Sequence, residues 1–395
     1  MTDVGTSAPL TEPERPRWLA RMERFDATNV LIVPVLAVVS AMLASGLIVA
    51  ATDIERLKHG EFGGIFSNII HAYRALFAGA FASWGGISET LVFATPLLLT
   101  GLAVALGFRA GLFNIGGTGQ MLAGGMATVW IGFSMPGPGI FKIPVAILAG
   151  IFAGAVFAGI LGFLKARTGA HEVITTIMAN YIATFLAAWM LKTSAFQQPG
   201  SANPISQAIS KNAHLPKLLN LFHPGLRANI GFLIAIAAAV GMWWLFSRSK
   251  LGFELRTFGA NADAARYAGM KLGGLTVTAM ALSGALAGLA GAVKILGTTP
   301  QATEAFAGDI GFDAIAVALL GRNTASGTVF AALLFGALEA GKTQMQLDTD
   351  VPLDLVLVVR ALIVLFIAAP ALTRLIWRIR KDGAASTLSF RGWGS

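Results

Sequence analysis

Seven stretches of this chain run for 19 or more positions without a charged residue. They lie between Asp26 and Asp53, Glu89 and Arg109, Arg109 and Lys142, Lys142 and Lys165, Glu172 and Lys192, Arg227 and Arg248, and Lys271 and Lys294. A helix needs about 20 mostly apolar residues to cross the hydrocarbon of a bilayer, so each stretch predicts a transmembrane helix. The composition agrees, because 55% hydrophobic and 12% charged residues is unlike a soluble domain.

Beyond Lys294 the apolar stretches are shorter, because acidic and basic residues interrupt them more often. They fit three further helices near 309–321, 324–341 and 355–373. The chain is therefore predicted to be an all-α polytopic membrane protein with about ten transmembrane helices. Its first apolar run exceeds the roughly 7 to 15 residues of a signal-peptide core, which favours a retained anchor over a cleaved leader.

The basic residues predict the orientation of these spans, since cytoplasmic loops carry an excess of Lys and Arg. With ten alternating spans, one side receives eighteen of them and the other side far fewer: Arg15, Arg17, Arg21, Arg24, Arg109, Lys165, Arg167, Arg248, Lys250, Arg256, Arg266, Lys271, Arg322, Arg374, Arg378, Arg380, Lys381 and Arg391. Both termini are then cytoplasmic, with tails at 1–28 and 374–395 around a membrane domain at 29–373. The net charge of +9 reflects this topology, and no nucleic-acid partner is expected.

The loop at 192–228 is an exception on the outer side. From Lys192 to Arg227 it carries four basic residues and no acidic residue. Two interpretations remain open, a docking surface for a partner and a tolerated long loop.

The stretch GALEAGKT, Gly336 to Thr343, fits the phosphate-loop pattern at every position. A working phosphate loop joins a strand to a helix inside a nucleotide-binding domain. Here apolar spans are predicted on both sides, and Lys342 falls at the outer end of its span. We therefore interpret the match as accidental and expect no nucleotide site, metal site or enzymatic site in this chain.

A polar segment at 248–270 separates two secure spans on the cytoplasmic side. Gly259 can end a first short helix, Asn261 is a good N-cap for a second, Asp263 suits its first turn, and Gly269 is a natural stop. About two turns remain, presenting Arg266 and Tyr267, and a helix this short needs something to pack on. A partner protein and the lipid headgroups both fit this requirement.

Polar groups inside the predicted membrane region point to a path for a solute. In LFNIGGTGQ, four glycines interrupt a potential helix next to Asn114, Thr118 and Gln120, and freed backbone in a membrane must line a cavity or pack on protein. A second interrupted element, GDIGFDAIAVALLGRN, contains Asp313. Corresponding broken segments in two halves indicate a central path, which we favour over the alternative that the glycines only permit close helix packing.

The fifth span carries Glu172, Thr176, Asn180 and Thr184 at intervals of four residues. Such a stripe faces either a wet pore or a neighbouring helix, and Asn180 lies at mid-span. Lys294, Glu339 and Arg360 are expected near helix ends, with their charges snorkelling toward water. Small residues such as Gly150, Gly154, Gly284 and Gly288 have the spacing of close helix contacts.

The segment LGFELRTFGANADAARYAGM resembles the coupling loop of permease subunits from ATP-binding-cassette importers of simple sugars and nucleosides, which are related to branched-chain amino-acid permeases. GFRAGLFNIGGTGQMLAGG, HEVITTIMANYIA and GFDAIAVALLGRNTASGTVFAALLFGALEAG agree in the family's order. Among the departures, Thr118 stands where the family commonly has Glu. The resemblance implies two pseudo-symmetric inverted halves and a short cytoplasmic coupling helix.

The resemblance assigns ATPase coupling to residues on the segment from Gly252 to Tyr267, namely Gly252, Arg256, Gly259, Asn261, Asp263, Arg266 and Tyr267. It implies a separate ATPase subunit that holds ATP and Mg, an extracytoplasmic substrate-binding protein and a second permease subunit, alike or different, in a bacterial plasma membrane. The expected substrate path uses Asn114, Thr118, Gln120, Thr176, Asn180 and Asp313.

The expected cargo is a small polar solute, a nucleoside by closest resemblance, with sugars and branched-chain amino acids as alternatives. An ion-coupled secondary transporter and a membrane scaffold without transport are the rival classes.

Overall fold

The computed structural model describes residues 33–52, 58–59, 61–219, 223, 225–349, 354–368 and 376–377. Almost all regular structure in these ranges is α-helical, with three isolated β-bridges in loops. The helices are α2 (Val33–Thr52), α4 (Phe62–Phe81), α5 (Trp84–Arg109), α6 (Gly117–Ser134), α7 (Gly139–Thr168), α8 (Glu172–Leu191), α9 (Gly231–Arg248), α10 (Lys250–Ala260), α11 (Ala262–Tyr267), α12 (Leu272–Gly297), α13 (Ile310–Leu320), α14 (Ala325–Asp348) and α15 (Asp354–Ala368), with a 3₁₀ turn at Lys211–Ala213. The predicted tail at 1–28, and that at 374–395 except 376–377, lie outside the described residues.

Five of the described helices, α5, α7, α8, α9 and α12, are long and apolar enough to cross a bilayer. Part of α2 and all of α13 form shorter apolar helices. These elements confirm a helical, polytopic membrane protein. The exact number of spans and the symmetry of two halves stay predictions.

Helix α4 was not among the predicted segments. His71 and Arg74 fall inside it, so no long charge-free run marks this stretch of sequence. The helix buries Ala72, Ala75 and Leu76, while Phe66 and Phe77 are exposed on its surface. An inward face of small residues lets α4 pack closely on α14, where Gly79 meets Gly341.

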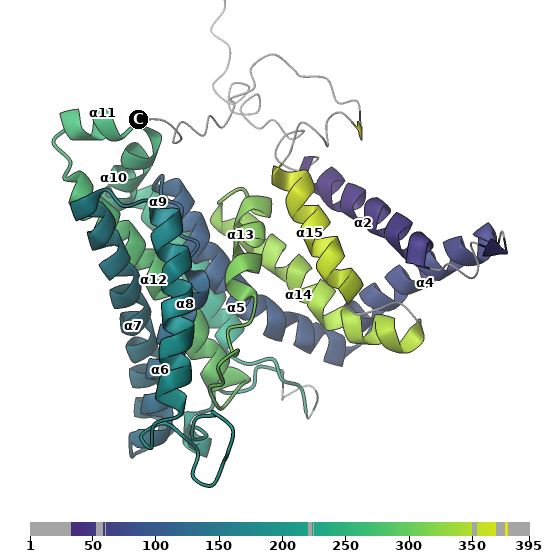
Figure 1. The fold of residues 1–395 in the computed structure, drawn as a ribbon, viewed down its shortest axis with the longest axis horizontal. Helices are drawn as coiled ribbons and strands as arrows, with labels where there is room; N and C mark the ends of the chain where they lie inside the picture. Colours follow the sequence, from purple (N-terminus) through teal and green to yellow (C-terminus); the bar gives the residue numbers. More distant parts are fainter. Residues whose placement is uncertain are drawn as a thin grey trace, which may run out of the picture.

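Helices far apart in the sequence form the core of the bundle. Helix α12 packs on α6 and α7, α5 packs on α13 and α14, and α2 packs on α15 (Figure 1). The predicted small-residue contacts occur at the crossing of α7 and α12, where a Cβ at Gly288 would lie 3.0 Å from Gly154 Cα. Without side chains at this crossing the two backbones approach closely, as expected for helices in a membrane.

The segment α10–α11 and the loop between α8 and α9 lie at opposite ends of the bundle (Figure 1). This loop is held by backbone hydrogen bonds to the end of α12 and to the chain after it, from Leu215 N to Leu296 O at 2.8 Å and from Ser206 N to Ala302 O at 3.0 Å. Opposite placement fits the predicted topology, in which 248–270 is cytoplasmic and 192–228 is external.

Candidate substrate path and coupling interface

The connection between α5 and α6 is the interrupted segment predicted from its glycines. Gly111 adopts a left-handed conformation, with φ +70°, and no helix forms until Gly117. Asn114 donates from Nδ2 to Gln120 Oε1 at 3.0 Å and to Ser283 Oγ on α12 at 2.7 Å. Gln120 donates back to Asn114 Oδ1 at 2.8 Å. All three side chains are buried, so these bonds fasten the interrupted segment to α12.

The polar stripe of α8 faces the same segment. Asn180 Oδ1 accepts from Gly119 N at 2.8 Å, and its Nδ2 donates to Ile115 O at 3.0 Å. Thr176 Oγ1 accepts from Ile115 N at 3.3 Å. Of the two orientations left open by the sequence, the structure shows the one toward a neighbouring segment, where these side chains supply the hydrogen bonds that a broken helix lacks.

Glu172, at the start of α8, continues this pattern toward the coupling end. Its carboxylate accepts from Phe113 N at 3.4 Å and pairs with Lys165 Nζ at 2.6 Å. Glu172 therefore holds the same interrupted segment through its bond to Phe113 and joins it to the end of α7 through its ion pair with Lys165.

Thr118 lies where the first turns of α6 and α13 meet. A Cβ on Gly311 would overlap Thr118 and would lie 2.9 Å from its Cα. The Thr118 hydroxyl oxygen is buried and has no hydrogen-bond partner among the described residues. The two predicted interrupted elements thus touch directly, through backbone that lacks bulky side chains.

Asp313 does not stand free on α13. Its carboxylate pairs with Arg360 Nη1 on α15 at 2.9 Å, and Arg360 also pairs with Glu339 on α14. Arg360 is 7% exposed near the middle of its helix. The expectation that Glu339 and Arg360 sit near helix ends and snorkel is wrong, because each is satisfied by the other inside the bundle.

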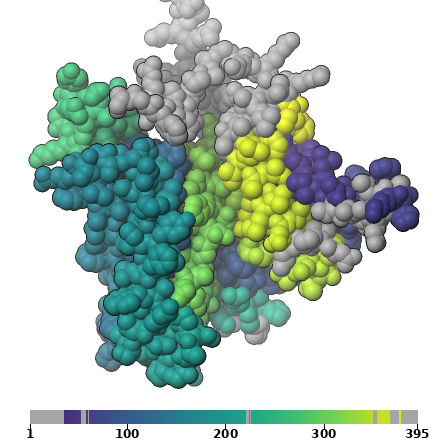
Figure 2. Space-filling model, viewed as in Figure 1, coloured from purple at the N-terminus to yellow at the C-terminus, as the bar shows by residue number. Residues whose placement is uncertain are grey.

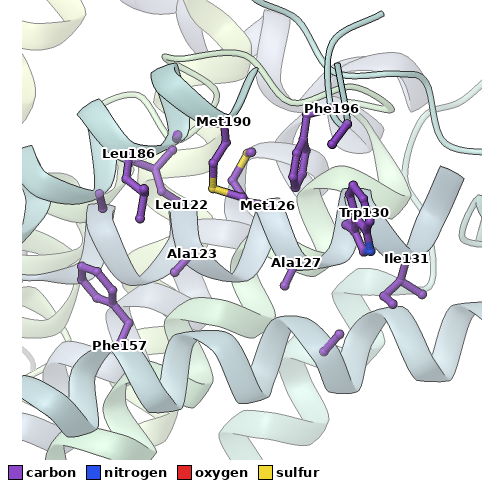
Figure 3. Close-up of a pocket in the computed structure, with 14 residues that line it drawn as sticks. Leu122, Ala123, Met126, Ala127, Trp130, Ile131, Phe157, Leu186, Met190 and Phe196 are labelled. Carbon is purple, nitrogen blue, oxygen red and sulfur yellow. The ribbon is translucent and has the colours of Figure 1, made fainter. Parts of the chain in front are cut away.

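An apolar pocket of about 530 Å³ lies between α6, α7 and α8. Figure 3 shows its wall, which includes Met126, Trp130, Leu186, Met190 and Phe196. Neither Asn114, Gln120, Thr176 nor Asn180 lines it. The pocket is suited to apolar chains or rings, and the predicted polar path residues lie elsewhere, in contacts between segments.

The segment 248–270 forms two short helices, as its caps predict. Ser249 accepts from Gly252 N at 2.9 Å at the start of α10, and Asn261 Oδ1 accepts from Ala264 N at 3.0 Å at the start of α11. Gly269, with φ +78°, follows the last turn. Gly259 was expected to end the first helix, but that helix continues to Ala260.

Two glycines of α10 are contact points rather than helix breakers. A Cβ on Gly252 would lie 2.9 Å from Phe246 Cα on α9, and one on Gly259 would lie 2.8 Å from Gly111 N. Arg109, just before Gly111, stacks its guanidinium on the Phe246 ring at 5.1 Å. Helix α10 is therefore packed against the corner from which the interrupted segment begins.

The other predicted coupling residues project from this corner: Arg256, Asn261, Asp263, Arg266 and Tyr267 are exposed. Tyr267 is 94% exposed. Within α11 only Ala265 is buried, so six residues of helix stand on the surface with almost no packing of their own. A helix of this length is unstable alone, so it needs something to pack on, and a partner protein and the lipid headgroups both fit this requirement.

GALEAGKT lies wholly inside α14. Its backbone amides are committed to helical hydrogen bonds and cannot surround a phosphate. Gly336 packs on α5, where a Cβ would lie 2.7 Å from Thr90 O, and Lys342 pairs with Glu339. These residues serve helix packing and an ion pair, which supports the prediction that the phosphate-loop match is accidental.

A bundle of apolar helices with an interrupted central segment, tied to an exposed helical corner at one end, is the fold of a polytopic membrane protein, and the family match makes it a permease. The chain belongs to the family described as the branched-chain amino acid transport system / permease component, which matches residues 86–368. No group of three or more His, Asp or Glu side chains that could hold a metal occurs among the described residues.

Several curated proteins resemble this chain over most of its length. The guanosine ABC transporter permease protein NupP of Bacillus subtilis is 38% identical, over 90% of this chain and 98% of its own length. The nucleoside ABC transporter permease protein NupB of Lactococcus lactis is 39% identical, over 87% and 92%. The glucose ABC transporter permease protein TsgB13 of Haloferax volcanii is 36% identical, over 85% and 86%.

Two further ABC transporter permease proteins from the same two bacteria, NupQ and NupC, match at 26% and 24% identity. No solved structure matches this chain. The family and the apolar helices together make this chain a multi-pass plasma-membrane permease of the ATP-binding-cassette class.

The sequence did not identify Ser283 or the contact between Gly259 and Arg109. Ser283 is bonded to Asn114 and Gly259 packs on Arg109, and the two residues of each contact lie more than a hundred positions apart, so no local pattern reveals them. Arg360 did carry a signal, because a charge in the middle of an apolar stretch requires a partner.

Proposed function

We propose that this chain is the permease subunit of an importer that takes up nucleosides across a bacterial plasma membrane. The observation that carries the proposal is the identity of 38% and 39% to relatives named for guanosine and nucleoside transport, over nearly their whole lengths. The interrupted segment at 110–116, held by Asn114, Thr176 and Asn180, forms a wall of the path in this proposal.

ATP and Mg are bound by a separate ATPase subunit, which docks on α10 and α11 at the cytoplasmic side. Tyr267 and Arg266 supply the exposed contact, and Gly259 passes the movement to the backbone of Arg109 and Gly111. Movement of the coupling corner then shifts the interrupted segment, because Asn114, Gln120 and Asn180 bond that segment to α12, α6 and α8.

The external face receives a substrate-binding protein. Lys192, Lys211, Lys217 and Arg227 are exposed there, and Lys192 and Arg227 pair only at the surface with Glu304 and Glu89. A basic surface of this kind attracts an acidic partner and steers its approach. Both termini are cytoplasmic in this topology.

A second permease chain completes the path. NupP and NupQ come from one organism, NupB and NupC from another, and this chain resembles the first of each pair more closely. We infer a heteromeric pair, in which the second subunit is the counterpart of NupQ and NupC.

The test is uptake of labelled guanosine, adenosine and uridine into vesicles that contain this chain with its co-purifying partners, with and without ATP. Glucose, ribose and leucine serve as competitors. ATP-dependent uptake of a nucleoside that the other solutes do not inhibit is the expected result. A glucose-specific, ATP-dependent uptake would replace the cargo by the sugar that the 36% identical relative TsgB13 is named for.

Uptake of a solute driven by a sodium or proton gradient, without ATP, would favour a secondary transporter instead. Unchanged uptake in cells that lack this chain would favour a scaffold.

A further inference from the structure

A network of charged side chains lies inside the bundle, away from the interrupted segment. Arg360 on α15 donates to Asp313 on α13 at 2.9 Å and to Glu339 on α14, and Glu339 also pairs with Lys342. Lys294, at the end of α12, donates to the backbone oxygen of Phe306 at 2.5 Å instead. Three helices, α13, α14 and α15, thus meet through charges in a region where charges are costly.

Arg360 is the centre of this network. It is 7% exposed, its guanidinium lies 5.9 Å from the Phe335 ring, and its Nε has no partner among the described residues. A planar guanidinium presents donors in a fixed fork, so it can bridge carboxylates on two different helices, which a lysine cannot do with the same geometry. Two carboxylates with Arg360 and Lys342 give a balanced set of charges.

The helix that Arg360 holds through Asp313 also contacts the start of α6, directly after the interrupted segment. Gly311 and Asp313 are two positions apart, about 200° around α13, and so face opposite sides. Gly311 packs on Gly117 and Thr118 at the start of α6. The ion pair between Arg360 and Asp313 lies on the side of α13 that faces α14 and α15, away from this contact.

The space-filling view shows α13 between the α7–α8 face and α15 (Figure 2). Helix α15 in turn packs on α2, so the ion pairs connect α13 with a pair of outer helices. A movement of α13 relative to α6 must carry α14 and α15 with it or break buried ion pairs, and leaving a buried charge unpaired is strongly unfavourable.

We propose that Arg360 is a positioning residue for transport, which makes α13, α14 and α15 move as one unit against the start of α6. This proposal rests on the transport function proposed above. It adds a specific role for a side chain that touches neither the interrupted segment nor the coupling helices. Asp313 then acts as the anchor of α13 and leaves no free carboxylate for the substrate.

The test compares the wild type with an uncharged variant that carries Asp313→Leu, Glu339→Met, Arg360→Met and Lys342→Met together, each in the assembled transporter. Replacing a complete buried ion network often leaves stability nearly unchanged, so this variant is expected to assemble. Its uptake should fall by about tenfold or more while ATP hydrolysis changes by less than about twofold, because coupling rather than assembly is lost. Asp348→Asn, on the exposed end of α14, is the matched control and should behave as wild type.

A second readout does not depend on the cargo. The chain contains no Cys, so Phe312→Cys on α13 and Phe330→Cys on α14, both exposed, can carry spin labels without background. The distance between them should stay constant with and without ATP in the wild type and should broaden in the uncharged variant.

Arg360→Lys, which keeps the charge but not the fork, should broaden the same distance distribution and lower uptake. This variant also tests the proposal if the uncharged variant fails to assemble. Normal uptake or an unchanged distance distribution in an assembled variant would overturn the proposal. If the wild type transports no nucleoside, the proposed cargo is wrong, but the distance measurement still tests the role of Arg360 because it does not depend on the cargo.

Discussion

Gly259 of α10 packs directly on the backbone of Arg109 at the end of α5, so closely that a Cβ at position 259 would overlap the Arg109 carbonyl. This contact joins α10, and through it the exposed α11, to the segment that leads into α6. It is a contact between backbones, and it can exist only while position 259 carries no side chain.

Gly259→Val should therefore uncouple the two regions. The chain should still bind its ATPase through α11, but uptake should fall by about tenfold or more, since the valine must push α10 away from Gly111. The measurement is uptake per ATP hydrolysed in vesicles. Gly274→Ala is the control, because its Cβ would lie 3.8 Å from Lys271 Cβ in ordinary contact. Equal coupling in both variants would contradict the role of Gly259.

Arg266→Glu combined with Tyr267→Ala should break co-purification with the ATPase. Both side chains are exposed, and among the described residues Arg266 makes only a surface ion pair with Asp263, so membrane insertion should be unchanged. Affinity purification from membranes, followed by quantification of the bound ATPase, measures the effect. Arg167→Glu, an exposed reversal at the end of α7, should retain the ATPase. Retained ATPase in the double variant would show that α11 is not the docking surface.

Asn180→Leu should destabilise the protein. It removes the acceptor for Gly119 N and the donor to Ile115 O, and each unsatisfied buried group costs about 1–3 kcal/mol. Thermal unfolding in detergent should show a lower Tm, with reduced uptake as a consequence. Tyr181→Leu, at an exposed position of the same helix, should leave the Tm close to wild type. An unchanged Tm with a raised KM for the solute would instead assign Asn180 to substrate binding.

Lys342→Ala should leave ATP hydrolysis by the assembled complex within about twofold of wild type, because a lysine inside a continuous helix cannot serve a phosphate loop. Thr343→Ala, at the position that would hold Mg in a true phosphate loop, should be equally harmless. Loss of ATP hydrolysis in either variant, with the complex intact, would mean that the phosphate-loop match is functional.

The membrane class, most spans and both coupling helices could be predicted from the sequence because the signals are local. Charge-free runs report span length directly, and Asn261 caps α11 through a bond to Ala264, three residues away. Helix α4 was missed because it lacks this local signal. Its Arg74 breaks the charge-free run, although the helix buries a face of small residues.

Only the tertiary structure decided what the polar residues contact. A periodic stripe on α8 has the same sequence whether it faces water or a neighbouring backbone, and the structure alone places Asn180 against Ile115 and Gly119. Arg360 had to find partners, but its pairs reach 47 positions back to Asp313 and 21 back to Glu339. The sequence determines which groups need satisfying, because burial of unpaired polar groups is costly, while helix packing determines which group satisfies them.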